Sequence, residues 1–328
     1  MSIIFTPAKR ENVGLLIGLA GGTGSGKTFS AMRLASGICG DKPFAMIDTE
    51  NGRALHYADQ FRFDHALLHP PFEPRAYAEA IKAADAAGYP VIVVDSMSHE
   101  WAGEGGVLEM HEAELQRLGG RDNMKMLAWA SPKADHKKMV QRMLQVRAHL
   151  ILCFRAEEKI EMKKDANNKT VIEKKAGLTG LDGWFPICEK NLPFELTTSF
   201  LLMAQRPGVP CPIKLQQQHR VIFPADQPIT EESGKRLAAW ASGGSVALAP
   251  TTAAGPLAPC DIIAKRWQKL HPKPANQSAK MYQEQFYFFV KSRVGQDITA
   301  AKDLTDESIE KLSIVLDEME TARQQVAA

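Results

Sequence analysis

One glycine-rich stretch near the N-terminus constrains the fold of this chain more than any other feature of its sequence. Residues 21–28 read Gly21-Gly22-Thr23-Gly24-Ser25-Gly26-Lys27-Thr28 and fit the pattern G-x-x-x-x-G-K-[ST]. The apolar run at 13–20 is typical of a strand buried on both faces, and residues 27–39 repeat apolar side chains at helical spacing. A strand, a glycine-rich turn and a helix in this order predict an α/β domain with a phosphate-binding loop after its first strand.

The residue types in this loop suit a nucleotide with Mg²⁺. Backbone N–H groups and the positive end of the following helix must approach phosphate oxygens closely, and glycines leave room for that approach. We predict that all eight residues bind the nucleotide. Lys27 places its charge between the β- and γ-phosphates, and the Thr28 hydroxyl coordinates Mg²⁺. A glycine-rich turn with a merely solvated lysine is the weaker alternative.

Acidic residues end two later segments that read as strands. Residues 91–96 read Val91-Ile92-Val93-Val94-Asp95-Ser96, which is the Walker B pattern, and we predict that Asp95 holds Mg²⁺ directly or through water. A strand-terminal Asp that caps the next turn is the alternative. Residues 43–50 predict another strand, which ends in Asp48-Thr49-Glu50. We predict that Glu50 orients or deprotonates the attacking water. Glu100 competes for this role, but it lies in a loop five residues beyond Asp95, which makes its position less certain.

Composition narrows the class of protein and its location. At 328 residues, with 45% apolar and 24% charged residues, the chain is expected to form one large soluble domain and a smaller one. No apolar run approaches the roughly 18 residues that span a bilayer. The N-terminus lacks the pattern of a signal peptide, and five scattered cysteines favour reduced thiols. We therefore predict a cytoplasmic location and no membrane partner.

Charge is distributed unevenly along the chain. Residues 95–114 contain six acids and no Lys or Arg, whereas residues 133–175 contain twelve Lys or Arg and six acids. Such a basic band indicates a polyanionic partner, although solvated helix faces give similar counts. The lysines that we predict to contact phosphate groups are Lys133, Lys137, Lys138, Lys163, Lys164, Lys174 and Lys175. In a protein that assembles with ATP between its subunits, as the resemblance described below implies, any of them could instead reach the γ-phosphate of a neighbouring subunit.

The remaining sequence predicts alternating strands and helices, then a linker and a helical module. Helices are expected at 76–88, 105–118, 132–147 and 230–242, a strand at 149–154, and antiparallel edge strands at 195–205 and 213–223. Residues 159–175 predict an exposed hairpin with an Asn-rich turn, and a loop is expected after residue 50. The predicted domains are 1–242, a Gly- and Pro-rich linker at 243–259, and a helical module at 260–328 with helices at 261–270, 278–294 and 305–326.

The order of the motifs resembles RecA-like ATPases. In that family the phosphate loop is followed by an Asp-x-Glu sequence on the next strand and then by Walker B, as Asp48-Thr49-Glu50 and residues 91–96 are here. The N-K-x-D sequence of GTPases is absent. The resemblance covers roughly residues 10–243. Residues 94–101 and 194–205 look like the corresponding segments of bacteriophage and prophage RecA-like proteins, which are associated with single-strand annealing and recombination.

The resemblance implies a RecA-like core with a mainly parallel sheet flanked by helices, and further site residues. Tyr57 has the spacing of a tyrosine that stacks on adenine. Arg155 falls where RecA-like proteins place a polar γ-phosphate sensor, although RecA itself has glutamine there. Residues 156–180 correspond in order to a mobile loop that contacts DNA. The resemblance thus implies catalytic roles for Lys27, Glu50 and Arg155.

The function expected from these features is hydrolysis of ATP with Mg²⁺ on single-stranded DNA, in phage recombination or replication. RecA-like proteins assemble as rings or filaments with ATP between subunits, so the resemblance also implies a homo-oligomer. One alternative is a nucleotide-gated protein that hydrolyses little ATP and recruits another phage protein through residues 260–328. The other is a motor ATPase that acts on DNA.

Overall fold

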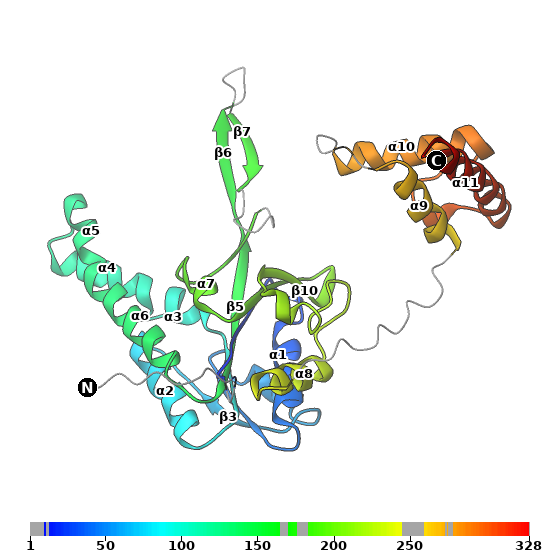
Figure 1. The fold of residues 1–328 in the computed structure, drawn as a ribbon. Coiled ribbons are helices and arrows are strands. Elements are labelled where there is room, and N and C mark those ends of the chain that lie inside the picture. Colours follow the sequence, from blue (N-terminus) through cyan, green and yellow to red (C-terminus); the bar gives the residue numbers. More distant parts are fainter. Residues whose placement is uncertain are drawn as a thin grey trace. The chain divides into compact units, whose positions relative to one another are not determined.

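The computed structural model describes residues 10, 13–164, 170–175, 183–244, 259–272, 274 and 278–327 (Figure 1). The chain divides into two compact units, Met1–Ala247 and Leu248–Ala328, and each is considered by itself. Most of the predicted linker lies outside the described residues, so the predicted domain boundaries stay a prediction. No helix in the described part of the chain is both long and apolar enough to cross a membrane.

A mostly parallel sheet forms the centre of the first unit. Within the described residues its strands follow the order β10-β9-β1-β5-β4-β2-β3, and β8 pairs with the far end of β5. Among the described strands of this sheet, the pairs β9–β10 and β5–β8 are antiparallel and the others are parallel. The strands are β1 Leu16–Gly21, β2 Phe44–Asp48, β3 Phe63–Leu67, β4 Val91–Asp95, β5 His149–Glu158, β8 Trp184–Pro186, β9 Thr198–Met203 and β10 Arg206–Lys214.

Helices cover both faces of this sheet. Figure 1 shows α1 and α8 on one side and α2 and α6 on the other. The helices of this unit with eight or more residues are α1 Lys27–Cys39, α2 Pro74–Ala86, α4 Val107–Arg117, α6 Ala130–Met143 and α8 Glu231–Ala241. Shorter ones are α3 Ser98–Ala102, α5 Lys125–Ala128, α7 Leu192–Glu195 and the 3₁₀ turns η1 Arg53–Tyr57, η2 Asp122–Met124 and η3 Gln217–His219.

The central strands are apolar on both faces because both faces are covered. In β4, Val91 and Val93 join the core under α1 and α8, whereas Ile92 and Val94 join the core under α2 and α6. Such doubly buried strands read as continuous apolar runs, which is why the sequence predicts them well. The predicted α/β fold with a mainly parallel sheet is confirmed.

The predictions near the sheet edges were partly wrong. Residues 195–205 were expected to form an antiparallel edge strand, but β9 lies inside the sheet and runs parallel to β1. Its buried Phe200, Leu201 and Leu202 require cover on both faces. The strand expected at 213–223 is instead β10, which ends at Lys214 and contains three prolines that an edge strand tolerates.

Two further differences concern strand extent. The loop expected after residue 50 contains an edge strand, β3, which pairs in parallel with β2. Most of its residues are exposed or half-buried, so it has no apolar run. Strand β5 continues to Glu158, beyond its predicted end at residue 154. It leads into the predicted hairpin, formed by β6 (Ile160–Lys164) and β7 (Thr170–Lys174), whose turn residues 165–168 lie outside the described part.

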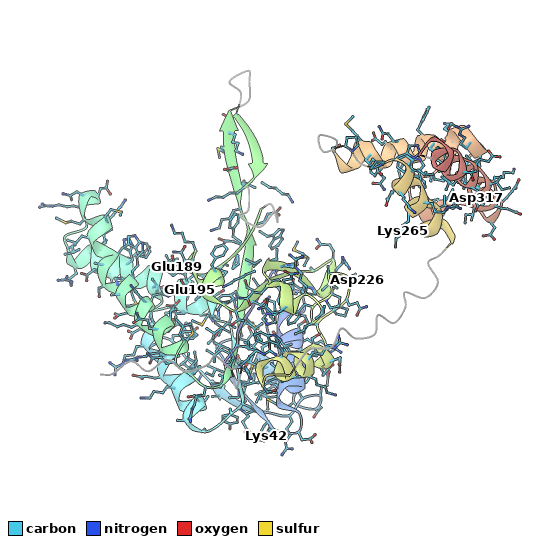
Figure 2. All side chains as sticks on the ribbon, in the orientation of Figure 1. Lys42, Glu189, Glu195, Asp226, Lys265 and Asp317 are labelled. Atoms are coloured by element: carbon cyan, nitrogen blue, oxygen red, sulfur yellow. The ribbon has the colours of Figure 1, made fainter. Side chains whose placement is uncertain are left out.

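The second unit is helical, as predicted. Helices α9 (Pro259–Leu270), α10 (Ala279–Val294) and α11 (Asp306–Ala327) pack around a small core, together with the 3₁₀ turn η4 (Ala301–Asp303). Trp267, Leu312 and Leu316 are among its buried residues. Figure 2 shows the side chains that surround these helices.

Two glycines let helices α1 and α8 approach closely. A Cβ atom at Gly37 would lie 1.9 Å from the carbonyl oxygen of Glu231, and one at Gly234 would lie 2.3 Å from that of Leu34. The Thr230 hydroxyl accepts the N–H of Ser233 and caps α8. Since α1 begins at Lys27, this packing also holds the phosphate loop against the sheet.

Replacing Gly37 by alanine should therefore lower the free energy of unfolding by about 1–3 kcal/mol, because the methyl group forces the two helices apart. Thermal and chemical denaturation would measure this change. The matched control is Ser36→Ala on the same helix, where the side chain is half-buried and a change within about 0.5 kcal/mol is expected. An unaltered melting temperature for the Gly37 variant would contradict the packing argument.

Candidate nucleotide-binding site

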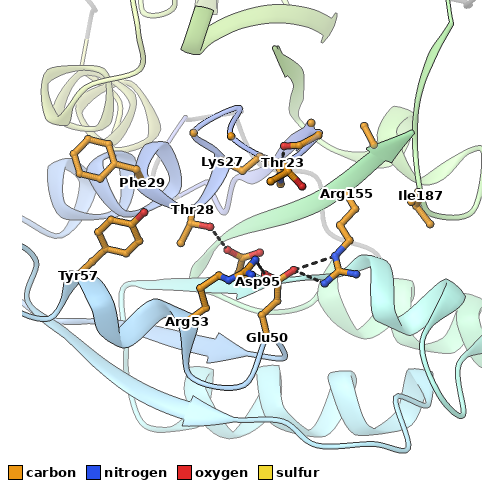
Figure 3. Close-up of a pocket in the computed structure, with 15 residues that line it drawn as sticks. Thr23, Lys27, Thr28, Phe29, Glu50, Arg53, Tyr57, Asp95, Arg155 and Ile187 are labelled. Carbon is orange, nitrogen blue, oxygen red and sulfur yellow. Dashed lines mark hydrogen bonds and ion pairs between the residues drawn. The ribbon is translucent and has the colours of Figure 1, made fainter. Parts of the chain in front are cut away.

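A cavity of about 650 Å³ opens where β1, β2, β4 and β5 end. It contains most of the residues that the sequence singles out, although they come from distant parts of the chain (Figure 3). Its volume lies within the range of small-molecule sites. The residues that line it are Gly21, Gly22, Thr23, Gly24, Gly26, Lys27, Thr28, Phe29, Glu50, Arg53, Tyr57, Asp95, Arg155, Ala156 and Ile187.

The phosphate loop forms one wall of this cavity. Gly26 has φ 80°, a left-handed conformation that precedes the first turn of α1, and a Cβ there would lie 3.0 Å from the backbone nitrogen of Gly208. Lys27 Nζ donates a hydrogen bond to the Gly22 carbonyl at 2.9 Å. Ser25 does not line the cavity. It is buried, and its hydroxyl donates to the same carbonyl at 2.8 Å, so it stabilises the loop from behind.

Thr28 and Asp95 both line the cavity, and their side chains contact each other. The Thr28 hydroxyl donates to Asp95 Oδ2 at 2.5 Å, and Asp95 is 5% exposed. Burial raises the pKa of the Asp95 carboxyl to about 6, although the hydrogen bond from Thr28 opposes this shift. The peptide bond between Asp95 and Ser96 is cis. A hydroxyl and a carboxylate side by side are the hard oxygen donors that Mg²⁺ prefers, so these two residues fit that ion.

Glu50 is held between two arginines. Arg155 donates to Glu50 Oε1 from Nη2 at 2.8 Å and from Nε at 3.0 Å, and Arg53 Nη1 donates to Oε2 at 2.8 Å. Burial by itself would raise the pKa of Glu50, but the hydrogen bonds and charge of Arg155 and the charge of Arg53 outweigh it, so the pKa is lowered. Figure 3 shows Glu50 and Arg155 facing each other, with Asp95 beside them.

Aromatic side chains form another part of the wall. Tyr57 lies with its ring centroid 5.8 Å from that of Phe29, and Phe61 packs on the Phe29 ring at 5.5 Å. Tyr57 is half-buried and lines the cavity at the start of α1, away from Arg155 (Figure 3). This arrangement leaves an aromatic surface beside the phosphate loop.

Glu100 belongs to the short helix α3 and not to the loop expected there, and it lies outside the cavity. It is 1% exposed, and His136 Nδ1 on α6 lies 2.8 Å from its Oε1. Its other oxygen, Oε2, has no hydrogen-bond partner among the described residues. Burial raises the pKa of Glu100, although the hydrogen bond with His136 opposes this.

The basic band is divided between two elements. Lys133, Lys137 and Lys138 belong to α6, whereas Lys163 and Lys174 belong to the β6–β7 hairpin, and Figure 1 shows this hairpin projecting beyond the sheet. Several of these lysines form ion pairs within the chain, such as Lys174 with Glu158 at 2.6 Å. The side chain of Lys164 lies outside the described part.

The base of the hairpin contacts the phosphate loop. The N–H of Gly183 donates to the Lys175 carbonyl at 2.8 Å, and the Gly183 carbonyl accepts the N–H of Lys159 at 2.6 Å. The next residue, Trp184, lies directly against Gly22, since a Cβ there would be 3.2 Å from the indole ring. One residue therefore connects the hairpin with the loop that is predicted to bind phosphate.

Sequence reasoning missed Arg53, Phe29 and Trp184. Arg53 follows Glu50 by three residues and Phe29 follows Thr28 directly, so proximity to the motifs was an available signal. Nothing in the sequence indicated Trp184, because its contact with Gly22 joins residues that are far apart in the chain.

Comparison with known proteins identifies the family. No curated protein matches the chain. The family model described as AAA domain matches residues 14–183, which is just over half of the 328 residues and includes the phosphate loop, Glu50, Asp95 and Arg155. The chain therefore belongs to the AAA domain family of P-loop ATPases, a family that binds nucleotides and generally hydrolyses ATP.

Proposed function

We propose that this protein hydrolyses ATP with Mg²⁺ and that its activity is coupled to single-stranded DNA in recombination or replication. The observation that carries the proposal is the convergence of Lys27, Asp95 and Glu50 on one cavity. These three groups come from α1, β4 and the loop after β2. A cation, a metal-binding acid and a second acid around one cavity are the groups that phosphoryl transfer needs.

Each group then has a separate part in hydrolysis. Thr28 and Asp95 would hold Mg²⁺, which would supply charge neutralisation at the phosphate oxygens. Lys27 leaves the Gly22 carbonyl and binds the β- and γ-phosphates. Glu50 accepts a proton from water whose oxygen attacks the γ-phosphorus, and the bond from that phosphorus to the bridging oxygen breaks, which yields ADP and phosphate. Tyr57 stacks on the adenine ring of the nucleotide.

Arg155 is proposed to sense the γ-phosphate. Its guanidinium is bonded to Glu50 in this structure, and a γ-phosphate offers the same kind of paired oxygen acceptors. If Arg155 moved from Glu50 to the γ-phosphate, the Glu50 carboxylate would be free to accept a proton from water. Binding of the nucleotide would then itself activate Glu50 as the general base.

The β6–β7 hairpin is the proposed contact for DNA. It carries lysines, its Ile160 and Met162 are 60% and 75% exposed, and its base touches the phosphate loop through Trp184. Exposed apolar groups beside cations suit a single strand, whose bases and phosphates are both accessible. The resemblance to RecA-like phage proteins supports this partner. It also supports a homo-oligomer, a role for residues 260–328 in recruiting another phage protein, and a location in the host cytoplasm.

A second candidate function is a nucleotide-gated binding protein with little hydrolysis. The observation that favours it is the pairing of Glu50 with two arginines, which lowers the pKa of this carboxyl and so makes it a weaker base. In that case ATP binding without hydrolysis would control how the hairpin and the second unit bind their partners.

The ATPase rate with and without single-stranded DNA, at low and high salt, distinguishes these candidates. Stimulation by the single strand that high salt removes supports the proposed function. A rate near zero under all four conditions, together with tight ATP binding, supports the gated binding protein. Stimulation by duplex DNA alone would contradict both and favour a motor.

We expect Glu50→Gln to abolish turnover while ATP binding persists, because the amide cannot accept the proton. Glu100→Gln should keep turnover and instead lose about 1–3 kcal/mol of stability, since it weakens the buried hydrogen bond with His136. Steady-state kinetics, nucleotide titration and thermal denaturation measure these effects on both variants. An active Glu50→Gln protein beside an inactive but stable Glu100→Gln protein would reverse the assignment.

Replacing lysine by glutamate, either on the β6–β7 hairpin or on α6, tests which of these two parts of the basic band contacts DNA. Lys174→Glu with Lys175→Glu on the hairpin should weaken binding of single strands and reduce the salt dependence of log K by about 0.7 for each phosphate contact that is lost. The control changes the same charge on α6, with Lys137→Glu and Lys138→Glu. Fluorescence anisotropy over a salt series gives both slopes, and a larger loss in the α6 variant would reject the hairpin as the contact.

A further inference from the structure

The first acid of the Asp48-Thr49-Glu50 run has no part in the proposed reaction. Asp48 ends β2, is 1% exposed and does not line the cavity. Its Oδ1 accepts the backbone N–H of Glu50 at 2.6 Å, and its Oδ2 accepts that of Ala54 at 3.0 Å. The Nε2 atom of His65 lies 3.2 Å from the same Oδ2. Both oxygens are therefore used inside the protein.

These contacts determine the shape of the loop that follows β2. The loop turns sharply at Asn51 and Gly52, which have φ values of 58° and 81°. Asp48 binds the N–H groups on either side of this turn, so the turn closes around its carboxylate. Hydrogen bonds from neutral N–H groups to a carboxylate are stronger than those between neutral groups.

The same loop carries three side chains that line the cavity. Glu50 precedes the turn, whereas Arg53 and Tyr57 belong to the 3₁₀ turn η1 after it. Beside the arginine contacts of Glu50 and the packing of Tyr57 on Phe29, the hydrogen bonds to Asp48 fix the backbone that carries these side chains, none of which is part of a strand or a long helix. His65 comes from β3, the edge strand next to β2, and its Nε2 lies near the same Asp48 oxygen that accepts the Ala54 N–H.

We propose that Asp48 is a positioning residue, which holds residues 49–57 so that Glu50 and Tyr57 face the nucleotide, and that His65 orients its carboxylate. The part that concerns water activation rests on the role proposed for Glu50. The part that concerns the shape of the loop is independent of that role. Asparagine at this position keeps one acceptor oxygen and places an NH₂ group against an N–H donor, so the turn should open without a change in side-chain size.

Asp48→Asn should speed amide hydrogen exchange in residues 49–57 by about tenfold to hundredfold. It should lower kcat on the order of tenfold to hundredfold, with a smaller rise in KM for ATP, because loosening Tyr57 weakens only the contact with the base while the phosphate loop is untouched. The matched control is Asp64→Asn on β3, whose exposed carboxylate accepts the Tyr89 hydroxyl at 2.7 Å and, among the described residues, forms no hydrogen bond with residues 49–57. That variant should match the wild type in both measurements.

The outcomes separate this inference from the role proposed for Glu50. Faster exchange in the Asp48 variant supports the inference even if Glu50→Gln proves active, because exchange needs no turnover. Unchanged exchange and kcat in a folded Asp48→Asn protein would overturn it. A test without any variant is also available: the amides of Glu50 and Ala54 should exchange more slowly than that of Asn51, which donates to no acceptor among the described residues. Equal rates at all three amides would overturn the inference as well.

Discussion

Burial of carboxylates at the carboxyl ends of two neighbouring parallel strands is the constraint on which this site depends. Asp48 and Asp95 are paired across β2 and β4, and both are almost fully buried. A buried charge without a partner costs several kcal/mol, so each acid must be matched by donors from elsewhere in the fold. Asp95 obtains its donor from the phosphate loop and Asp48 from the backbone of the next loop.

These pairings organise the surroundings of the sheet edge. The bond from Thr28 to Asp95 spans β5, which lies between β1 and β4, and so ties the start of α1 to the Walker B strand. The hydrogen bonds that Asp48 accepts from backbone N–H groups shape the loop that carries Glu50. Glu100 obtains its partner from α6 and lies outside the cavity, so the two glutamates that compete in sequence are separated in space.

Two connections lead outward from the phosphate loop. Helix α1, which begins directly after the loop, packs closely on α8 through Gly37 and Gly234. On its other side Gly22 touches Trp184 at the base of the β6–β7 hairpin. A ligand at this loop would therefore lie beside both the α1–α8 helix pair and the residue that leads to the projecting hairpin.

The sequence predicted the buried parts of the fold better than the edges. β4 and α1 are apolar where they are buried, and each was placed within a residue of its observed bounds. β3 was missed because an edge strand that is half exposed needs no apolar run. β9 was misplaced because pairing order depends on which faces are covered, and the apolar residues of a strand do not state which neighbour it has.

For the site, the sequence by itself determined the chemical groups: a glycine-rich loop with Lys27 and Thr28, and acids at strand ends that reach the same edge of a parallel sheet. Only the tertiary structure decided which groups meet. It placed Glu50 rather than Glu100 in the cavity, paired Glu50 with Arg155, and brought Trp184 to Gly22. Local patterns follow from backbone geometry within a few residues. Contacts between distant residues depend on strand order and on burial, which are properties of the whole fold.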